Sequence, residues 1–249
     1  MQSLKNKVAI VTGASSGIGR ATALLFAEHG AAVVLNARGR ESLEQVAAMI
    51  RDNGGQAHAV TGDVALEETH EALVDAATRV FGGLDIAFNN AGTVGPIKPL
   101  AEATAEEWQH TLAANLSSAF LASRHQVPAM LKRGGGALVF TSTFVGTSVG
   151  IPGMGAYAAA KAGLMGLVKG LTADYAHRGI RANALLSGGV DTAMAGDAAQ
   201  KEWAAGLHAL KRIAAPEEIA QAALFLASPM ASFVAGTALF ADGGNAAVK

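Results

Sequence analysis

Short apolar runs alternate with longer amphipathic segments along most of the chain. Apolar or β-branched runs predict strands near residues 8–11, 32–38, 57–60, 84–88, 137–141, 180–186 and 237–240. Between them, segments such as 20–29, 41–53, 67–81 and 217–227 combine apolar and polar positions at helical spacing. Strands that alternate with helices form parallel βαβ units with right-handed crossovers. The pattern therefore predicts an α/β fold built on a parallel sheet.

Length and composition favour a single domain. The 249 residues, 51% of them hydrophobic, can bury one sizeable core, and no repeat or linker divides residues 1–249. The net charge of -1 provides no electrostatic basis for binding nucleic acid or an anionic membrane. The lack of cysteine rules out disulfides and thiolate chemistry. Residues 1–7 lack the apolar run of a signal peptide, and no apolar stretch is long enough to span a membrane, so we expect a cytoplasmic protein.

The first predicted strand runs into a glycine-rich turn, Thr12-Gly13-Ala14-Ser15-Ser16-Gly17-Ile18-Gly19, and then into a helix. A strand, a glycine turn and a helix in this order are typical of a dinucleotide phosphate site. Gly13 permits the tight turn, Gly17 lets the backbone approach a pyrophosphate, and Gly19 lets helix and strand pack closely. The start of the helix offers N–H groups to the anion. A plain strand-to-helix loop is the alternative interpretation.

The end of the second predicted strand indicates which dinucleotide would bind. Dinucleotide sites often place an acidic residue there to bind the ribose 2′-hydroxyl. This chain has Ala37, followed by Arg38 and, two residues on, Arg40. A cation without a carboxylate suits a 2′-phosphate, so we expect NADP(H), with NAD as the alternative. After the third strand, Asp63, followed by Val64, could accept a hydrogen bond from a purine amine or could cap the next helix.

Polar residues also gather where the fourth and fifth strands end. Asn89-Asn90-Ala91-Gly92 closes the fourth strand, where open α/β sheets bind ligands, although asparagine and glycine are also common turn formers. Ser142 and Thr143 follow the fifth strand on the same rim. Between these strands, residues 104–107 form a capping-box pattern that opens a long helix, with Asn115 in its interior. An asparagine is mildly unfavourable there, which indicates a specific role.

Tyr157 and Lys161 lie four residues apart in a predicted helix of small residues. Positions i and i+4 share one helix face, which places the phenol beside the ammonium. A free tyrosine has a pKa near ~10, and a neighbouring cation favours the phenolate and lowers that pKa. Such a tyrosine can act as a general acid or base at neutral pH. For an isolated pair, a packed tyrosine and a solvated lysine would be the simpler interpretation.

In this order and spacing, the motifs resemble those of the short-chain dehydrogenases/reductases over essentially the whole chain. The resemblance implies a single-domain, Rossmann-like doubly wound fold, with a seven-stranded parallel sheet and helices on both faces. It also implies a homotetramer or a homodimer. The matching residues are Thr12-Gly13-x-x-x-Gly17-Ile18-Gly19, Asp63, Asn89-Asn90-Ala91-Gly92, Asn115, Tyr157-x-x-x-Lys161, Gly188 and Thr192.

The resemblance assigns roles to individual residues. Tyr157 would give or take the proton on the substrate oxygen, and Lys161 would lower the pKa of Tyr157 and bind the nicotinamide ribose. Asn115 would support a water that leads protons to Lys161, and Thr192 would bond the nicotinamide carboxamide. The cofactor would perform the hydride step. The implied cofactor-binding residues are Gly13, Ser15, Ser16, Gly17, Ile18, Gly19, Arg38, Asp63, Val64, Asn90, Ala91, Gly92, Tyr157, Lys161, Gly188, Val190 and Thr192.

Two positions depart from the family pattern. The family often has two serines after the fifth strand, with the second one catalytic, whereas this chain has Ser142-Thr143. Thr143 occupies the catalytic place, yet Ser142 has the family's residue type, so both are candidates and Ser142 is the first choice. Ser187-Gly188 replaces the usual Pro-Gly after the sixth strand. This change frees the base of residues 193–212, which form the candidate substrate lid.

We therefore expect an NADP(H)-dependent dehydrogenase or ketoreductase that transfers a hydride between the cofactor and an uncharged ketone or secondary alcohol. An alternative enzyme is a 3-oxoacyl-carrier-protein reductase, although the chain has no dense basic cluster for an acidic carrier. The alternative outside enzymes is a dinucleotide-sensing binding protein, which would not need Tyr157 and Lys161. We expect no catalytic metal, because the seven histidines show no ligand spacing.

Overall fold

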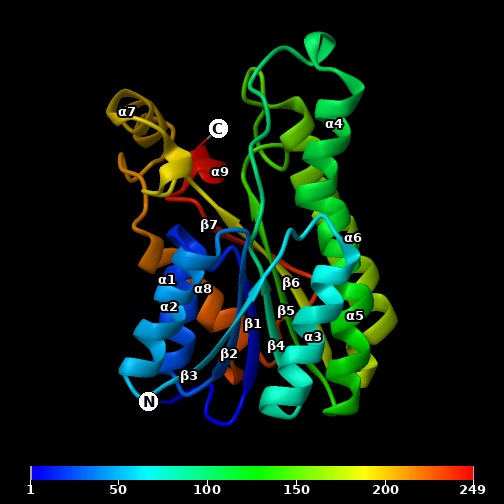
Figure 1. The fold of residues 1–249 in the computed structure, drawn as a ribbon. Helices are drawn as coiled ribbons and strands as arrows, with labels where there is room; N and C mark the ends of the chain where they lie inside the picture. Colours follow the sequence, from blue (N-terminus) through cyan, green and yellow to red (C-terminus); the bar gives the residue numbers. More distant parts are fainter. Residues whose placement is uncertain (1, 249) are drawn as a thin grey trace.

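A parallel sheet forms the centre of the molecule (Figure 1). The computed structural model describes residues 2–248. Among these residues the sheet has seven strands in the order β3-β2-β1-β4-β5-β6-β7, and every neighbouring pair is parallel. The predicted α/β, Rossmann-like fold is therefore confirmed. The strands are β1 (Val8–Thr12), β2 (Ala32–Ala37), β3 (Gln56–Thr61), β4 (Ile86–Asn89), β5 (Gly136–Thr143), β6 (Ile180–Ser187) and β7 (Ala238–Ala241).

Helices cover both faces of this sheet (Figure 1). One face is covered by α1 (Gly17–Glu28), α2 (Arg40–Asp52) and α8 (Pro216–Ala227). The other face is covered by α3 (Glu67–Phe81), α5 (Ser118–Lys132) and α6 (Gly155–Tyr175). Within residues 2–248, none of the helices combines the length and the apolarity that a membrane span requires. The shorter helices are α4 (Ala105–Leu112), α7 (Ala198–Gly206) and α9 (Asn245–Val248), with 3₁₀ turns at Leu100–Glu102, Ala176–Arg178, Ala193–Ala195 and Pro229–Ala231.

Strand β1 illustrates how the sequence produces these layers. All of its residues are buried, as expected for a central parallel strand that is covered on both faces. Because side chains alternate along a strand, Ala9 and Val11 join the apolar cluster on the α1 side, which includes Phe26. Val8 and Ile10 join the cluster on the α3 side. Burial on both faces thus ties the two helix layers to one sheet.

The order of the strands reverses at the centre of the sheet. From β1 the chain moves outward to β2 and β3, then returns to β4 on the other side of β1 and continues outward to β7. Open α/β sheets bind ligands at such a reversal, outside the carboxyl ends of the strands. Here the ends of β1 and β4 bring Gly13 close to Asn90, so a Cβ on Gly13 would lie 2.9 Å from Asn90 Nδ2.

The segment between β4 and β5 contains one continuous helical rod with a widened turn. The predicted capping box opens it: Glu107 N donates to Thr104 Oγ1 at 3.2 Å, and Thr104 N donates to Glu107 Oε2 at 2.8 Å. Helix α4 then passes through a π-helical turn, Ala113–Ser117, directly into α5. Asn115 lies within this turn. Such turns are rare and occur frequently at functional sites.

Candidate active site

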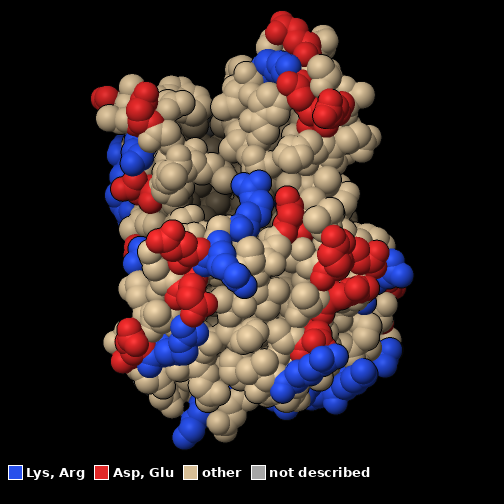
Figure 2. Space-filling model, in the orientation of Figure 1, with Lys and Arg blue, Asp and Glu red and all other residues tan. Residues whose placement is uncertain are grey.

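A cavity of about 540 Å³ opens at the carboxyl edge of the sheet. Figure 2 shows a hollow between the α7 side and the α4 side of the molecule, with Lys or Arg side chains along its lower edge. The cavity wall combines the turn after β1 with residues at the ends of β2 to β6 and with residues of α6. Most of the predicted site residues therefore meet in one space, of a size typical for ligand pockets.

The glycine turn between β1 and α1 forms one part of this wall. Gly13 and Gly17 have φ values of 68° and 51°, a region that favours glycine. A Cβ on Gly19 would lie 2.1 Å from Gly13 O, so the start of α1 can pack against the turn only without a side chain. Gly19 itself lies behind the wall. The predicted residues of the turn that line the cavity are Gly13, Ser15, Ser16, Gly17 and Ile18.

The start of α1 is suited to bind an anion. Ser16 occupies the N-cap, and its side chain makes no capping hydrogen bond. The first turn of the helix contains no acidic residue. Free backbone N–H groups and the positive end of the helix dipole are therefore available beside the cavity. These features fit the pyrophosphate of a dinucleotide.

Arg38 lines the cavity just beyond the end of β2. Its side chain is exposed, and the residues on either side of it carry no charge. Asn36 donates two hydrogen bonds of 3.1 Å, to Val60 O and Gly62 O, and so joins the ends of β2 and β3. A fixed strand end therefore presents the Arg38 cation to the cavity.

Asp63 and Val64 form the neighbouring part of the wall. Asp63 Oδ1 accepts a hydrogen bond of 2.9 Å from Ala65 N. Helix α3 begins only at Glu67, with Leu66 at its N-cap. The carboxylate thus shapes the turn before the helix and does not cap the helix, and it borders the cavity as the dinucleotide interpretation requires.

Asn90 connects three strand ends. Its N–H donates to Thr12 Oγ1 at 2.9 Å, and its Nδ2 donates to Thr12 O at 3.1 Å. Its Oδ1 accepts a hydrogen bond of 3.2 Å from Thr141 Oγ1 on β5. Ala91 and Gly92 follow it along the wall. The side chain therefore holds the edges of β1, β4 and β5 together at the cavity.

Asn115 is buried in the π-helical turn, where it meets the cavity wall. Its Nδ2 donates hydrogen bonds of 2.8 Å to Thr93 O and Thr111 O, and its Oδ1 accepts one of 3.2 Å from Thr93 N. A Cβ on Gly92 would lie 2.5 Å from this oxygen. The amide thus fastens the loop after β4 to the helical rod. The proton-leading water assigned to Asn115 stays a prediction.

Tyr157 and Lys161 share one face of α6 and line the same cavity. Lys161 is only 4% exposed, and its Nζ donates a hydrogen bond of 2.8 Å to Thr141 O on β5. The Nζ atom lies 5.8 Å from the centroid of the Tyr157 ring. The structure therefore brings the two predicted residues together and anchors the lysine to the sheet.

The surroundings of this pair disfavour charge on both groups. Burial raises the pKa of Tyr157 to about 12 and lowers the pKa of Lys161 to about 8. Lys161 Nζ bonds Thr141 O and lies over the Tyr157 ring, and burial is what raises the pKa of the phenol. Burial thus outweighs any effect of the neighbouring ammonium on the phenol, and the lowering of the Tyr157 pKa by Lys161 stays a prediction.

The two candidate hydroxyls after the fifth strand point in opposite directions, because side chains alternate along β5. Ser142 lines the cavity, and its Oγ donates a hydrogen bond of 3.0 Å to Lys161 O on α6. Thr143 Oγ1 donates one of 3.2 Å to Ser187 O on β6, and Thr143 does not line the cavity. Ser142 therefore borders the cavity and Thr143 does not, and the choice of the hydroxyl that holds the substrate stays a prediction.

Thr192 brings the segment after β6 to the glycine turn. A Cβ on Gly17 would lie 2.9 Å from Thr192 Cγ2. Thr192 lines the cavity together with Ala193 and Met194, at the start of the predicted lid. Within the lid, residues 193–195 form a 3₁₀ turn and residues 198–206 form α7. The start of the lid therefore borders the predicted cofactor site.

Gly188 and Val190, also predicted to bind the cofactor, lie behind the cavity wall. Gly188 N donates to Ala241 O at 3.1 Å, and Val190 is buried and forms a β-bridge with Ala214. Both residues support the segment that carries Thr192.

Several wall residues have no motif that would have identified them. The Lys161 anchor is the backbone carbonyl of Thr141, and a carbonyl leaves no signal in a sequence. Alternation along β5 could have placed Thr141 on the face opposite Ser142. Thr93 and Met194 fall in segments that the sequence predicts to line the pocket, whereas the unpredicted wall residues include His110, Ala114 and Ser187.

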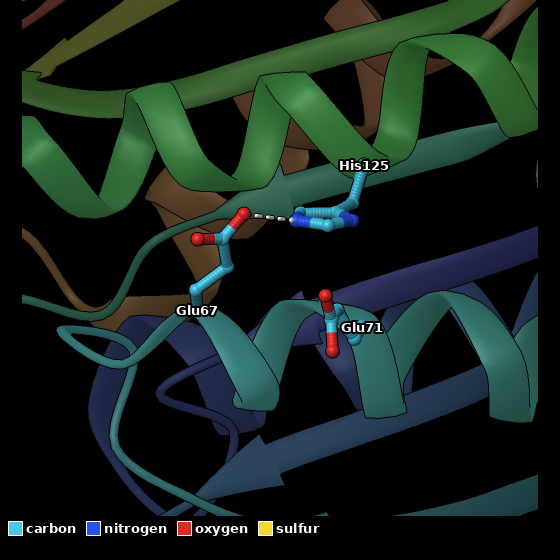
Figure 3. Close-up of side chains that lie close together, drawn as sticks. All are labelled: Glu67, Glu71 and His125. Atoms are coloured by element: carbon cyan, nitrogen blue, oxygen red, sulfur yellow. Dashed lines mark hydrogen bonds and ion pairs between the residues drawn. The ribbon is translucent and has the colours of Figure 1, made fainter.

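Glu67, Glu71 and His125 lie close together between α3 and α5 (Figure 3). One ligand atom from each lies within 4.8 Å of the others, and Glu67 Oε1 bonds His125 Nε2 at 3.0 Å. Arg124 Nη1 already supplies a cation 3.0 Å from that same oxygen. Sequence spacing could not reveal this cluster, because Glu67 and His125 are 58 positions apart. None of the three lines the cavity.

Known proteins resemble this chain along almost its full length. The family model described as enoyl-(acyl carrier protein) reductase matches residues 13–246. A cyclohexanol dehydrogenase of Acinetobacter sp. (strain SE19) is 40% identical, over 96% of this chain and 94% of the relative. A 2,5-dichloro-2,5-cyclohexadiene-1,4-diol dehydrogenase of Sphingobium indicum is 41% identical over 100% of both chains. A 7α-hydroxysteroid dehydrogenase solved in complex with NADH and 7-oxo glycochenodeoxycholic acid is 34% identical, with a TM-score of 0.92, and the match covers 98% of this chain and 95% of the other.

The site and these relatives agree on the class of reaction. The glycine turn, the uncapped start of α1 and the adjoining Tyr157 and Lys161 fit a nicotinamide dinucleotide. The relatives are dehydrogenases that act on CH–OH groups, so this protein is an oxidoreductase that uses a nicotinamide cofactor. The chain belongs to the short-chain dehydrogenase/reductase family.

Proposed function

We propose that this protein interconverts secondary alcohols and ketones carried on six-membered carbon rings, with NADP(H) preferred over NAD(H). The observation that carries the proposal is the meeting of Ser142, Tyr157 and Lys161 in the wall of the dinucleotide cavity. Two relatives named above are dehydrogenases of cyclohexanol and of a cyclohexadienediol. The wall also contains Ala114 and Met194, which suit an uncharged ring.

Different residues around the cavity would bind different parts of the cofactor. The glycine turn and the start of α1 would bind the pyrophosphate, and Arg38 would bind the 2′-phosphate. Asp63 and Thr192 would bind the adenine and the carboxamide, and Lys161 would bind the nicotinamide ribose. When bound, the nicotinamide supplies a hydride to the ketone carbon or accepts one from the alcohol carbon.

Tyr157 would move the proton. In oxidation, its phenolate takes the substrate hydroxyl proton while the C–H bond breaks and the C=O bond forms; in reduction, the phenol returns that proton. Ser142 Oγ would hold the substrate oxygen, and we place it before Thr143 because Ser142 lines the cavity. The Lys161 ammonium, four residues along α6, would favour the phenolate against the effect of burial.

The proposal is tested by a turnover screen with NADP⁺ and NAD⁺. The substrates are cyclohexanol, a cyclohexane-1,4-diol, a straight-chain secondary alcohol and a 3-hydroxyacyl group on an acyl carrier. We expect the cyclic alcohols to be oxidised with the highest kcat/KM, and with NADP⁺ better than NAD⁺. Turnover of the carrier-bound substrate alone would favour the 3-oxoacyl-carrier-protein reductase. Cofactor binding without turnover of any substrate would favour a dinucleotide sensor.

Arg38 provides a sharp test of cofactor preference. Arg38→Ala is expected to weaken NADPH binding by about 10- to 100-fold, because a hydrogen bond to a charged group contributes about 1.5–3 kcal/mol. NADH binding should change little, since NADH has no 2′-phosphate. Titration by nicotinamide fluorescence measures both.

Arg40→Ala is the matched control, because Arg40 begins α2 and does not line the cavity. It should leave both affinities unchanged. Equal losses for the two cofactors in Arg38→Ala, or tighter NADH than NADPH binding by the unaltered protein, would contradict the assignment of Arg38.

Three predictions from the sequence accompany this proposal. We expect the protein to be cytoplasmic and to assemble as a homotetramer or homodimer. We also expect residues 193–212 to act as a lid over the substrate, since Ala193 and Met194 already line the cavity.

A further inference from the structure

His208 lies in the candidate lid, two residues beyond the end of α7, and is only 2% exposed. Its Nε2 accepts a hydrogen bond of 3.0 Å from Gly189 N. A nitrogen that accepts this bond carries no proton, so the ring is neutral with its hydrogen on Nδ1. That Nδ1 is buried and has no partner within residues 2–248. A buried polar group left unpaired calls for an explanation.

The His208 ring packs against the ends of several strands. A Cβ on Gly188, just after β6, would lie 2.7 Å from His208 Cε1. A Cβ on Gly243, just after β7, would lie 3.2 Å from His208 Cβ. The ring of Phe144, just after β5, meets the imidazole edge-to-face at a centroid distance of 5.7 Å. One side chain of the lid is therefore wedged against the rim of the sheet beside the cavity.

The backbone around His208 fixes both ends of the lid. Ala214 N donates to Gly189 O at 2.9 Å, and Asp191 N donates to Ala214 O at 2.8 Å. Asn245 Nδ2 donates to Leu207 O at 2.6 Å. Gly189 is thus held through its carbonyl by Ala214 and through its N–H by His208. The imidazole thus supplies the side-chain bond to Gly189.

The anchored segment leads directly into the cavity. Thr192 follows Gly189 by three residues, lines the wall and packs against Gly17, and Met194 lines the wall beyond it. A shift of the backbone at Gly189 would therefore move Thr192 away from the glycine turn.

We propose that His208 is a positioning residue for the cofactor, which fixes the Gly189 backbone so that Thr192 meets the nicotinamide half of the dinucleotide. This inference rests on the cofactor site proposed above. It gives the buried, neutral imidazole a task, which is to accept the hydrogen bond of Gly189 N. Nε2 performs this task, whereas Nδ1 has no partner within residues 2–248.

The test compares His208→Leu, which removes the acceptor, with His208→Gln, whose amide oxygen can reach Gly189 N. Binding of the reduced cofactor is measured by fluorescence. Binding of ADP-ribose and its 2′-phosphate, which lack the nicotinamide, is measured by calorimetry. We expect His208→Leu to bind the reduced cofactor about 10-fold more weakly, which corresponds to about 1.4 kcal/mol. Its affinity for the ADP-ribose ligands should be unchanged, and His208→Gln should restore most of the cofactor affinity.

Other results would overturn the inference. Equal weakening of the cofactor and of the ADP-ribose ligands would indicate general loss of structure, and equal binding by His208→Gln and His208→Leu would show that the acceptor does not matter. If His208→Leu fails to fold, His208→Asn takes its place, because its amide lies near Nδ1 and does not reach Gly189. Failure of the unaltered protein to bind either reduced cofactor would instead contradict the proposed function.

Discussion

Replacing Tyr157 with phenylalanine should lower kcat by about 10³-fold or more in both directions of the reaction, since positioned acid–base groups contribute about 10²–10⁴ in rate. The change removes only the hydroxyl that would exchange the proton with the substrate oxygen. The ring and its packing beside Lys161 remain, so the affinity for the reduced cofactor should stay nearly constant. Steady-state kinetics and nicotinamide fluorescence measure the two effects separately.

The chain provides a matched control for this experiment. Tyr175, the second of the two tyrosines, ends the same helix α6 and does not line the cavity. Tyr175→Phe should keep the activity of the unaltered protein. If Tyr157→Phe retained a tenth of the activity, another group would have to transfer the proton and the assignment of Tyr157 would fail.

Replacing Lys161 with methionine should impair both cofactor binding and turnover. The ammonium is expected to bind the nicotinamide ribose and to favour the Tyr157 phenolate, so kcat/KM should fall by about 10³-fold or more. Methionine has nearly the same length and suits a buried position, so the fold should be retained. Lys169→Met, two turns along α6 at an exposed position, is the control and should be active. Unchanged cofactor affinity in Lys161→Met would contradict the ribose-binding role.

The pKa of Lys161 adds a second readout for the same variant. Burial lowers this pKa from 10.5 to about 8, so the unfolded chain binds more protons than the native protein between these two values. Through this group, the free energy of unfolding should therefore rise as the pH increases from about 8 toward 10. Denaturant unfolding at both pH values should show this gain in the unaltered protein and not in Lys161→Met. An equal change in the two proteins would mean that Lys161 is not buried as described.

The sequence predicts most of this site because its residues carry local signals. Gly13 and Gly17 are required by backbone conformation, and the four-residue spacing of Tyr157 and Lys161 is set by the helix itself. The place of such residues at the carboxyl edge of the sheet follows from the order of the strands, which the alternation of strands and helices indicates. Residues of this kind can be assigned without coordinates.

Other features depend on contacts between distant segments and have no such signal. His208 meets Gly189 across 19 residues, and Lys161 is anchored by a carbonyl on β5. The pKa of Tyr157 depends on how much protein surrounds the phenol, which spacing alone could not reveal. The orientation of Ser142 and Thr143 likewise became clear only from their hydrogen-bond partners on α6 and β6.

The π-helical turn at Ala113–Ser117 changes the rotation of α4 about the helix axis relative to α5. The rotation of α5 about its axis is set by its packing on the sheet. On α4, His110 lines the cavity. Each residue of an α-helix adds about 100° of rotation. Deleting one residue from the turn would therefore rotate α4 by that angle relative to α5 and carry His110 off the wall. A single-codon deletion here should reshape the cavity while the sheet and its covering helices stay in place.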